Sequence, residues 1–318
     1  RLEQNKVIPR SVPMFAAFDP FDERAYQKIE MIPPFWIKPI KSFRSFLAYK
    51  INSEYQFNDY MPEIQEHIDY MSEPFNYVFK NFELPHEYAS MRETMIAESP
   101  ITGHQCTVEG YVYDGEGVVY GIVDSVREED RSSFARYEYP SSLPQEIQFR
   151  MADLARRAII QIGLNNSAFN IEFFYNSTVN QIFLLEINPR ISQAHTDIFE
   201  KVHGVSHHSI MLNLALGRRP RALEYRGPYR IAANFMLRIY ETGRVTRVPS
   251  KEEIGKLQER YPGMALKLHV QVGMHLSELQ GQDSYSYELA NLYLGARNQE
   301  ELIEKYDDCL ANLTFEIE

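Results

Sequence analysis

Glu172, Glu186 and Asn188 place oxygen donors on two short apolar segments that follow each other in the chain. Carboxylate and amide oxygens suit hard divalent cations, and magnesium typically takes one or two carboxylates together with waters and phosphate oxygens. Arg190, two residues beyond Asn188, adds a positive fork for a phosphoryl or carboxylate oxygen. The pattern predicts a magnesium site that handles phosphate.

Two predicted strands, Phe169–Tyr175 and Gln181–Ile187, must position these groups across a polar turn. Because side chains alternate along a strand, Glu186 and Asn188 share one face, and a turn centred between the strands puts Glu172 on that face too. The alternate positions are apolar and are expected to be buried: Ile171, Phe173, Leu185 and Ile187. Solvent exposure of both glutamates is the alternative, but metal ligation is favoured because an unpaired carboxylate inside apolar strands is costly.

The remaining pattern alternates strands and helices. We expect strands at Phe35–Lys38, Ala48–Ile51, Met95–Glu98, Thr107–Tyr113, Val118–Val123, Ile231–Ile239 and Leu266–Val272. We expect helices at Asp59–Tyr70, Glu146–Gly163, Val205–Leu216 and Asn298–Leu310. The segment up to about Tyr26 predicts only short extended pieces and turns.

Composition narrows the class of protein. The 318 residues carry 33 basic and 44 acidic side chains, a formal charge of −11, and 44% are apolar, which is typical of a globular protein of about two units. The acidic balance argues against a nucleic-acid partner, and no apolar run is long enough to span a bilayer. Two distant cysteines, Cys106 and Cys309, indicate neither a disulfide nor a zinc site and favour a reducing, cytoplasmic compartment.

The motif Phe-Asn-Ile-Glu-Phe at 169–173, followed by Leu-Leu-Glu-Ile-Asn-Pro-Arg at 184–190, resembles the ATP-grasp superfamily, in particular its carboxylate–amine ligase and biotin carboxylase-like branch. The resemblance runs from about Val7 to the C-terminus. It implies an α+β fold whose two subdomains grip ATP. It further implies two magnesium ions, with manganese as an alternative, held by Glu172, Glu186 and Asn188, and a catalytic Arg190 near the transferred phosphoryl group or the acyl phosphate.

The resemblance also assigns roles elsewhere in the chain. Lys38 is similar to the lysine that reaches the nucleotide phosphates, with a solvated strand end as the alternative. The backbone at Glu98 and Ile101 would hydrogen-bond adenine. Gln105 falls where many relatives place a ribose-binding glutamate, and a plain surface turn explains it nearly as well. Arg238 falls where the C-terminal domain of relatives supplies a substrate-facing arginine, and a structural salt bridge is an equal alternative.

Two departures from the family pattern stand out. The loop after the phosphate lysine is usually glycine-rich, but residues 40–46 contain no glycine, although Ser42 and Ser45 could still donate hydrogen bonds to phosphate. Biotin carboxylases continue after the arginine with a Gln-Val-Glu-His-like stretch, whose glutamate is replaced here by Ala194. The second departure disfavours biotin carboxylation in its usual form.

The histidines near this motif are expected to be structural, and three segments are expected to shape the substrate pocket. His203 and His207 have zinc-ligand spacing, but no catalytic glutamate lies beside them, so partly exposed structural roles are expected for His195, His203, His207 and His208. The substrate pocket would be shaped by Val126–Tyr139, interpreted as a charged mobile loop or a disordered crossing, by residues 190–195 and by the C-terminal region.

The resemblance implies an ATP-grasp core over residues 1–225 and a biotin carboxylase-like C-terminal region over residues 226–318. Residues 27–97 would form the small nucleotide-lid subdomain of the core, and residues 1–26 and 98–225 its larger part. The start at Arg1 leaves no room for the α/β domain that normally precedes the core, so a truncated chain is expected.

The implied function is a cytoplasmic ligase. ATP would phosphorylate a substrate carboxylate, and an amine or similar nucleophile would capture the acyl phosphate to form a carbon–nitrogen bond. The expected partners are small carboxylate and amine substrates, with no nucleic acid or membrane, and a homodimer is left open. The alternatives are a non-catalytic ATP-binding sensor or inactive paralogue, suggested by the glycine-free loop, and, less favoured, a biotin carboxylase-type enzyme.

Overall fold

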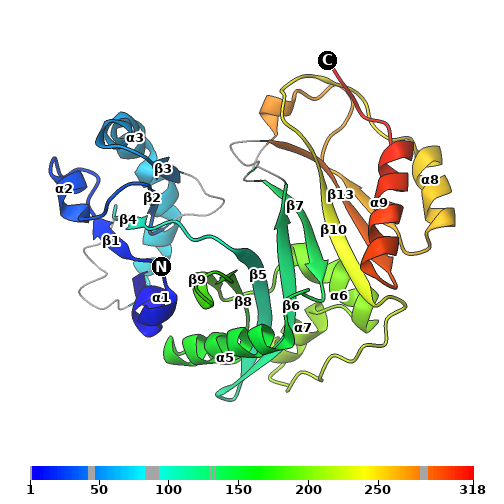
Figure 1. Cartoon of the computed structure of the whole chain (residues 1–318), viewed down its shortest axis with the longest axis horizontal. Helices are drawn as coiled ribbons and strands as arrows, with labels where there is room; N and C mark the ends of the chain where they lie inside the picture. The colour runs from blue at the N-terminus through cyan, green and yellow to red at the C-terminus, as the bar shows by residue number, and fades with distance from the viewer. Residues whose placement is uncertain (1, 42–46, 83–92, 129–130, 132, 280–285) are drawn as a thin grey trace. The chain divides into compact units, whose positions relative to one another are not determined.

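The computed structural model describes residues 2–41, 47–82, 93–128, 131, 133–279 and 286–318 (Figure 1). The chain divides into two compact units, residues 1–102 with 183–185 and residues 103–182 with 186–318. Each unit has its own sheet. Among the described residues, no helix is long and apolar enough to cross a membrane.

The first unit is a four-stranded sheet with one long helix. Its elements are α1 (Leu2–Val7), β1 (Phe15–Phe18), α2 (Ala25–Ile29), β2 (Phe35–Pro39), β3 (Tyr49–Ile51), α3 (Glu54–Phe79) and β4 (Met95–Glu98). The strands pair antiparallel in the order β1-β4-β2-β3. Ser53 caps α3 by accepting a hydrogen bond from the backbone nitrogen of Gln56, which favours the helix start.

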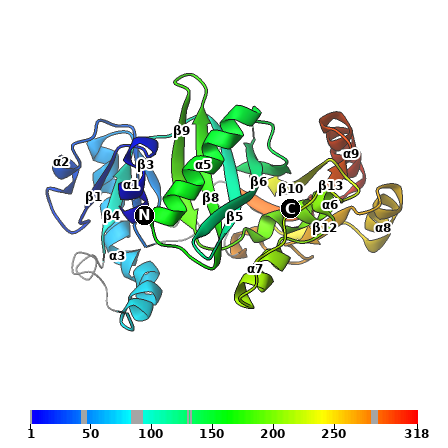
Figure 2. The same cartoon turned by 90° about the horizontal axis from the view of Figure 1, so that it is seen from below.

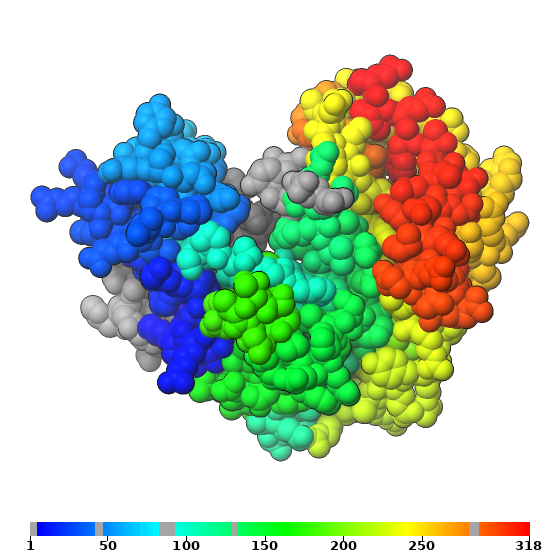
Figure 3. All heavy atoms as spheres, viewed as in Figure 1, coloured from blue at the N-terminus to red at the C-terminus, as the bar shows by residue number. Residues whose placement is uncertain are grey.

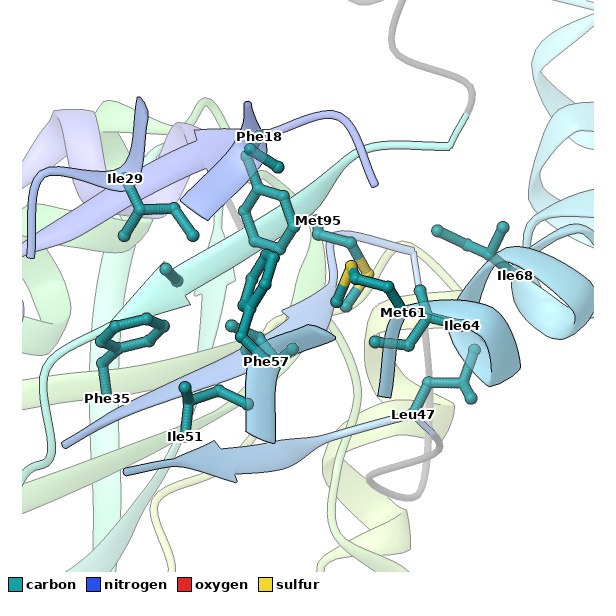
Figure 4. Packing of buried hydrophobic residues seen from close by; sticks show 13 residues of the cluster. Phe18, Ile29, Phe35, Leu47, Ile51, Phe57, Met61, Ile64, Ile68 and Met95 are labelled. Carbon is teal, nitrogen blue, oxygen red and sulfur yellow. The ribbon is translucent and has the colours of Figure 1, made fainter. Parts of the chain in front are cut away.

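Side chains of α3 fill the core of the first unit (Figure 4). Phe57, at the start of the helix, lies with its ring centroid 5.6 Å from that of Phe18 on β1. Ile64 and Ile68 follow at helical spacing and are buried. Burial of this apolar stripe holds α3 against the sheet.

The second unit is built on an eight-stranded sheet. Its strands are β5 (His104–Tyr113), β6 (Glu116–Arg127), β7 (Phe134–Tyr139), β8 (Ser167–Asn176), β9 (Gln181–Asn188), β10 (Ile231–Ile239), β12 (Ala265–Leu268) and β13 (Tyr287–Ala296), in the order β12-β13-β10-β7-β6-β5-β8-β9. The strands β11 (Val245–Arg247) and β14 (Glu316–Ile317) form a separate pair. The helices are α5 (Gln145–Gln161), α6 (Thr196–His203), α7 (His208–Ala215), α8 (Lys251–Arg260) and α9 (Gln299–Asn312).

Strand β5 divides its side chains between two faces of this sheet. One face packs on α5, which lies along β5, β6 and β8 (Figure 2), and there the Cys106 sulfur is 3.3 Å from the Met151 sulfur. Gly110 on this face has no room for a Cβ because the Phe169 ring lies against it. The opposite face carries polar side chains, among them the buried Thr107 and Glu109.

Helices α8 and α9 lie side by side and form part of the outer surface of the second unit, toward the red end of the colour scale (Figure 3). Beneath α9, Leu292 on β13, Leu302 and Cys309 are fully buried. Both cysteines of the chain are buried and unpaired.

The expected mixed helix-and-sheet fold is confirmed, but some elements differ. Residues 126–139, expected to be a mobile loop or a disordered crossing, contain the end of β6 and all of β7. In β9 the apolar alternation is offset, because Leu184 is fully buried whereas Leu185 and Ile187 are only half-buried. Strands β10, β12 and β13 extend the sheet that contains β5 and β8, and the domain boundaries expected from sequence stay predictions.

Candidate active site

A small polar pocket lies on the face of the sheet away from α5. Its volume is about 150 Å³, and it is lined by Thr107, Ser125, Phe134, Tyr137, Asn170, Glu172, Arg190, Ser192 and His195. Strands β5 to β8 each contribute, and the last three residues come from the segment after β9. Residues 134–137 and 190–195 were both expected to shape a substrate pocket, and both segments line this one.

Glu172 and Arg190, two residues predicted from the sequence, line the pocket together. Nε2 of Gln105 donates to Oε2 of Glu172 at 3.2 Å, and Oε1 of Gln105 accepts from Nη2 of Arg127 at 2.7 Å. The Arg127 guanidinium stacks over the Phe134 ring at 4.3 Å. Gln105, expected at a ribose site, thus uses its side chain to orient Glu172.

Asn170 connects Asn188 to the pocket. Its Oδ1 accepts from Nδ2 of Asn188 at 3.4 Å, so both amides lie on one face of the β8–β9 pair. Oδ1 of Asn188 in turn faces Nη2 of Arg190 at 3.5 Å. Glu186, two residues before Asn188 on β9, is half-buried.

Glu109 is the centre of a buried network that sequence reasoning missed. Its carboxylate is fully buried and accepts hydrogen bonds from Nδ2 of Asn170 at 2.7 Å, the backbone nitrogen of Ser192 at 3.2 Å and the Tyr120 hydroxyl at 3.4 Å. Oε1 also lies 2.8 Å from Nδ1 of His195. These donors compensate the cost of burying a carboxylate. Glu109 lies in the strand expected at Thr107–Tyr113, where an unpaired carboxylate is as costly as it is at Glu172.

His195 was expected to be partly exposed, but only 2% of it is accessible. Its ring meets the Tyr137 ring edge-on at 4.8 Å and 78°. The carbonyl oxygen of Ala194 accepts from Nδ2 of Asn234 at 3.2 Å, which fixes the backbone beside it. The ring is held in the pocket wall by the Glu109 bond and by packing.

His203 and His207 are also buried, not partly exposed. Nδ1 of His203 donates to the carbonyl oxygen of Glu224 at 3.1 Å, and its Nε2 lies 2.8 Å from the Tyr139 hydroxyl. His207 bonds Tyr120 and Thr196 through its two nitrogens. Burial lowers the pKa of His203, and burial together with the neighbouring His195 and His208 lowers the pKa of His207 to about 3. Both are neutral packing residues of the second unit.

The chemistry of the donor set fits a hard divalent cation. Glu172, Glu186 and Asn188 supply carboxylate and amide oxygens without sulfur or imidazole, and such ligands suit magnesium. Within the part of the chain that the structure describes, no cluster of three or more histidine, cysteine, aspartate or glutamate side chains could hold a metal ion by itself. Bound magnesium would therefore depend on the asparagine and on phosphate or water oxygens as well.

The nucleotide residues expected on the first unit lie on β2, on β4 and just beyond it. Lys38 forms an ion pair with Glu98 on the neighbouring strand, and the two side chains are 13% and 5% exposed. Ile101 follows β4 and is half-buried. Ser42 and Ser45 lie outside the described residues.

Arg238 on β10 is anchored by three bonds. It donates to the carbonyl oxygen of Phe134 at 3.0 Å and to the Ser286 hydroxyl at 2.9 Å, and it pairs with Glu288 at 2.8 Å. Its side chain is 8% exposed. Because Phe134 lines the pocket, Arg238 supports the pocket wall, and a direct contact with substrate stays a prediction.

Comparison with known proteins identifies the family and the fold. A family model described as the ATP-grasp domain matches residues 31–197, more than half of the chain. No curated protein sequence matches it significantly. The L-amino acid ligase from Bacillus licheniformis is similar in structure with a TM-score of 0.75 and 14% identity, over 99% of this chain and 72% of that protein.

Two further solved structures share the fold. The biotin carboxylase from Campylobacter jejuni, solved as a beta-gamma-ATP complex, has a TM-score of 0.67 and 16% identity over 99% of this chain and 67% of its own. The biotin carboxylase domain of Hydrogenobacter thermophilus 2-oxoglutarate carboxylase, solved with MgADP, ADP and bicarbonate, has a TM-score of 0.65 and 16% identity over 99% and 65%. The chain belongs to the ATP-grasp family, and the expected ATP-grasp fold is confirmed.

Proposed function

We propose that this chain is an ATP- and Mg²⁺-dependent ligase that activates a substrate carboxylate as an acyl phosphate for capture by an amine. One observation carries the proposal: Glu172 and Arg190 line the same small polar pocket. A carboxylate suited to a cation and a guanidinium suited to an anion then act on one bound group. The fold shared with a protein named as an amino acid ligase supports the choice of a carboxylate and an amine as substrates.

Each predicted residue has a role in this proposal. ATP supplies the phosphoryl group, and Mg²⁺ neutralises charge on its phosphates. Two Mg²⁺ ions, with Mn²⁺ as an alternative, would be held by Glu172, Glu186 and Asn188. Residues that bind the nucleotide would be Lys38, Ser42, Ser45, Glu98, Ile101 and Gln105. Arg190 would bind the acyl phosphate, and Arg238 would act at the substrate. A cytoplasmic location and a homodimer are further parts of the proposal.

The test measures ADP release with Mg²⁺ and each of the twenty amino acids in turn. We expect at least one amino acid to stimulate ADP release in the wild type. Glu172→Gln and Glu186→Gln should each lower the stimulated rate by about 100-fold or more, because neither amide carries the charge that a cation needs. Glu200→Gln, at an exposed position of α6, is the matched control and should leave the rate unchanged.

Other outcomes identify the alternatives. Thermal stabilisation by ATP without any carboxylate-stimulated ADP release would favour a non-catalytic sensor or inactive paralogue. ADP release that requires bicarbonate and biotin together would favour a biotin carboxylase-type enzyme, against which the alanine at position 194 argues. Full activity of Glu172→Gln would contradict the metal assignment.

A further inference from the structure

We propose that His195 is the base that takes the proton from the attacking amine, and that Glu109 is the residue that positions it. This inference rests on the proposed ligase function and adds a catalytic residue to it. It starts from the His195–Glu109 pair, which joins a histidine of the pocket wall to a fully buried carboxylate.

Glu109 determines which nitrogen of His195 carries the proton. The other three partners of the carboxylate, from Asn170, Ser192 and Tyr120, are all donors, so Glu109 acts purely as an acceptor. Nδ1 of His195, 2.8 Å from Oε1, must then donate, and in the neutral ring Nε2 carries the lone pair. A carboxylate behind Nδ1 also stabilises the imidazolium that forms when Nε2 accepts a proton.

Nε2 of His195 is available for a ligand. Across the described part of the chain, no hydrogen bond to Nε2 is formed, and Nε2 is not one of the fully buried polar atoms that lack a partner, so the small accessible part of the ring includes this atom. An acceptor that is open in the wall of a polar pocket can receive a hydrogen bond from a donor on the substrate. An amine N–H is such a donor.

The His195 ring is placed to assist the second chemical step, in which the amine attacks the acyl phosphate. Glu172 and Arg190, at which the acyl phosphate is proposed to form, line the same pocket as His195. Nε2 of His195 first takes one proton from the ammonium form of the amine. The neutral nitrogen then bonds to the acyl carbon, the bond from that carbon to the phosphate oxygen breaks, and inorganic phosphate leaves with the electron pair and takes the second amine proton. The products are an amide, inorganic phosphate and a protonated His195, which loses its proton to solvent before the next turnover.

Among the described residues, the ionisable groups on the elements packed around His195 include Glu109, Tyr120, Tyr137, Glu172, Arg190 and His207. Burial raises the pKa of both tyrosines, and the pKa of His207 is lowered to about 3, so these three are neutral near pH 7. Glu109, Glu172 and Arg190 are the other members of this set.

The experiment compares two nucleophiles on the same acyl phosphate. Hydroxylamine is uncharged at neutral pH and traps acyl phosphates as hydroxamates without help from a base, whereas an amino acid amine must lose a proton. His195→Asn keeps a donor that can reach Glu109 but has no basic nitrogen. We expect hydroxamate formation, with the amino acid that best stimulates ADP release, to stay within about twofold, and amide formation to fall by about 100-fold or more. Glu109→Gln should also lower amide formation relative to hydroxamate formation, but by a smaller factor than His195→Asn does.

The outcomes distinguish a failure of the base assignment from a failure of the proposed ligase function. If the wild type forms no hydroxamate with any of the twenty amino acids, the ligase proposal fails and the base assignment with it. If the wild type forms hydroxamate and His195→Asn loses both reactions equally, the ring has a structural role and only the inference is overturned. Unchanged amide formation in His195→Asn also overturns it. Recovery of amide formation by His195→Asn at a pH where the amine is already deprotonated supports it, because a structural defect would not recover.

Discussion

Gln105 and Glu172 share a partly buried hydrogen bond of 3.2 Å, in which the amide Nε2 donates to the carboxylate Oε2. The other end of the amide accepts from Arg127, whose guanidinium is stacked on the Phe134 ring. The orientation of the carboxylate therefore depends on a chain of three side chains from β5, β6 and β7. Loss of a group that orients a metal ligand typically costs about 10–100-fold in metal affinity or activity.

Gln105→Leu should weaken magnesium binding. Leucine has a similar length but cannot bond Glu172, so the carboxylate loses its fixed orientation. We expect the Mg²⁺ concentration that half-saturates ATP turnover to rise by about 10-fold, with little change in the rate at saturating Mg²⁺. Gln161→Leu, at the exposed end of α5, serves as the control. An unchanged Mg²⁺ requirement in Gln105→Leu would show that this bond does not support a metal ligand.

Gly110→Ala should destabilise the second unit. A Cβ at this position would press on the Phe169 ring and lie 2.6 Å from the carbonyl oxygen of Val118, and a backbone atom in a sheet cannot easily move. We expect a loss of about 1–3 kcal/mol in the free energy of unfolding, measured by urea denaturation. Gly255→Ala on α8 meets nothing within 4 Å and should instead stabilise by about 0.5–1 kcal/mol. Equal effects of the two substitutions would contradict the packing argument.

The His104–Asp124 pair should make stability depend on pH. Their side chains lie 2.8 Å apart, and the Asp124 carboxylate raises the pKa of His104 above its ordinary 6.5. Burial tends to raise the pKa of Asp124, but bonds from His104, Ser141 and Ser142 outweigh it and lower that pKa below 3.8.

The raised pKa of His104 and the lowered pKa of Asp124 give opposite dependences of the free energy of unfolding on pH. The contribution of His104 is fully present below about pH 6.5 and is lost as pH rises through its raised pKa. The contribution of Asp124 is present above pH 3.8 and is lost as pH falls through its lowered pKa. The free energy of unfolding of the wild type, relative to His104→Gln, should therefore decrease between neutral and mildly alkaline pH. A constant difference over that range would contradict the prediction.

Arg238→Lys should impair catalysis more than stability. Lysine keeps a positive charge for Glu288 but cannot also reach the Phe134 carbonyl oxygen and Ser286, so the pocket wall loses an anchor. We expect kcat/KM for the carboxylate substrate to fall by about 10-fold with a nearly unchanged Tm. Arg260→Lys, which alters an exposed pair with Asp308, is the control. A lower Tm with full kcat/KM would assign Arg238 a purely structural role.

Local patterns were sufficient for much of the fold. The strand at Ile231–Ile239 and the hairpin of β5 and β6 were predicted because β-rich apolar runs and a tight Asp-Gly turn are encoded in adjacent residues. Strand β7 was missed because Arg136 and Glu138 make it resemble a charged loop. In the structure these two side chains pair with each other at 2.8 Å, which permits their partial burial.

Contacts across long separations account for what could not be predicted. Glu109 and His195 are 86 residues apart, and they meet only after β5 pairs with β8 and the segment after β9 folds over the sheet. The offset in β9 has a similar origin, because β9 is an edge strand and periodicity does not say which of its faces is covered. Glu172 and Arg190 were predictable because they lie on one compact motif, whereas the residues that orient them come from other strands.

The four hydrogen bonds of the Glu109 carboxylate restrict which substitutions related proteins can carry at these positions. Loss of any one side-chain donor, from Tyr120, Asn170 or His195, leaves a buried charge short of a partner, and loss of the carboxylate leaves several donors unpaired. A single substitution at any one of these positions therefore gives a destabilised protein. Among sequences descended from a common ancestor with this chain, we expect positions 109, 120, 170 and 195 to covary, so that this hydrogen-bond network is replaced as a whole or kept as a whole.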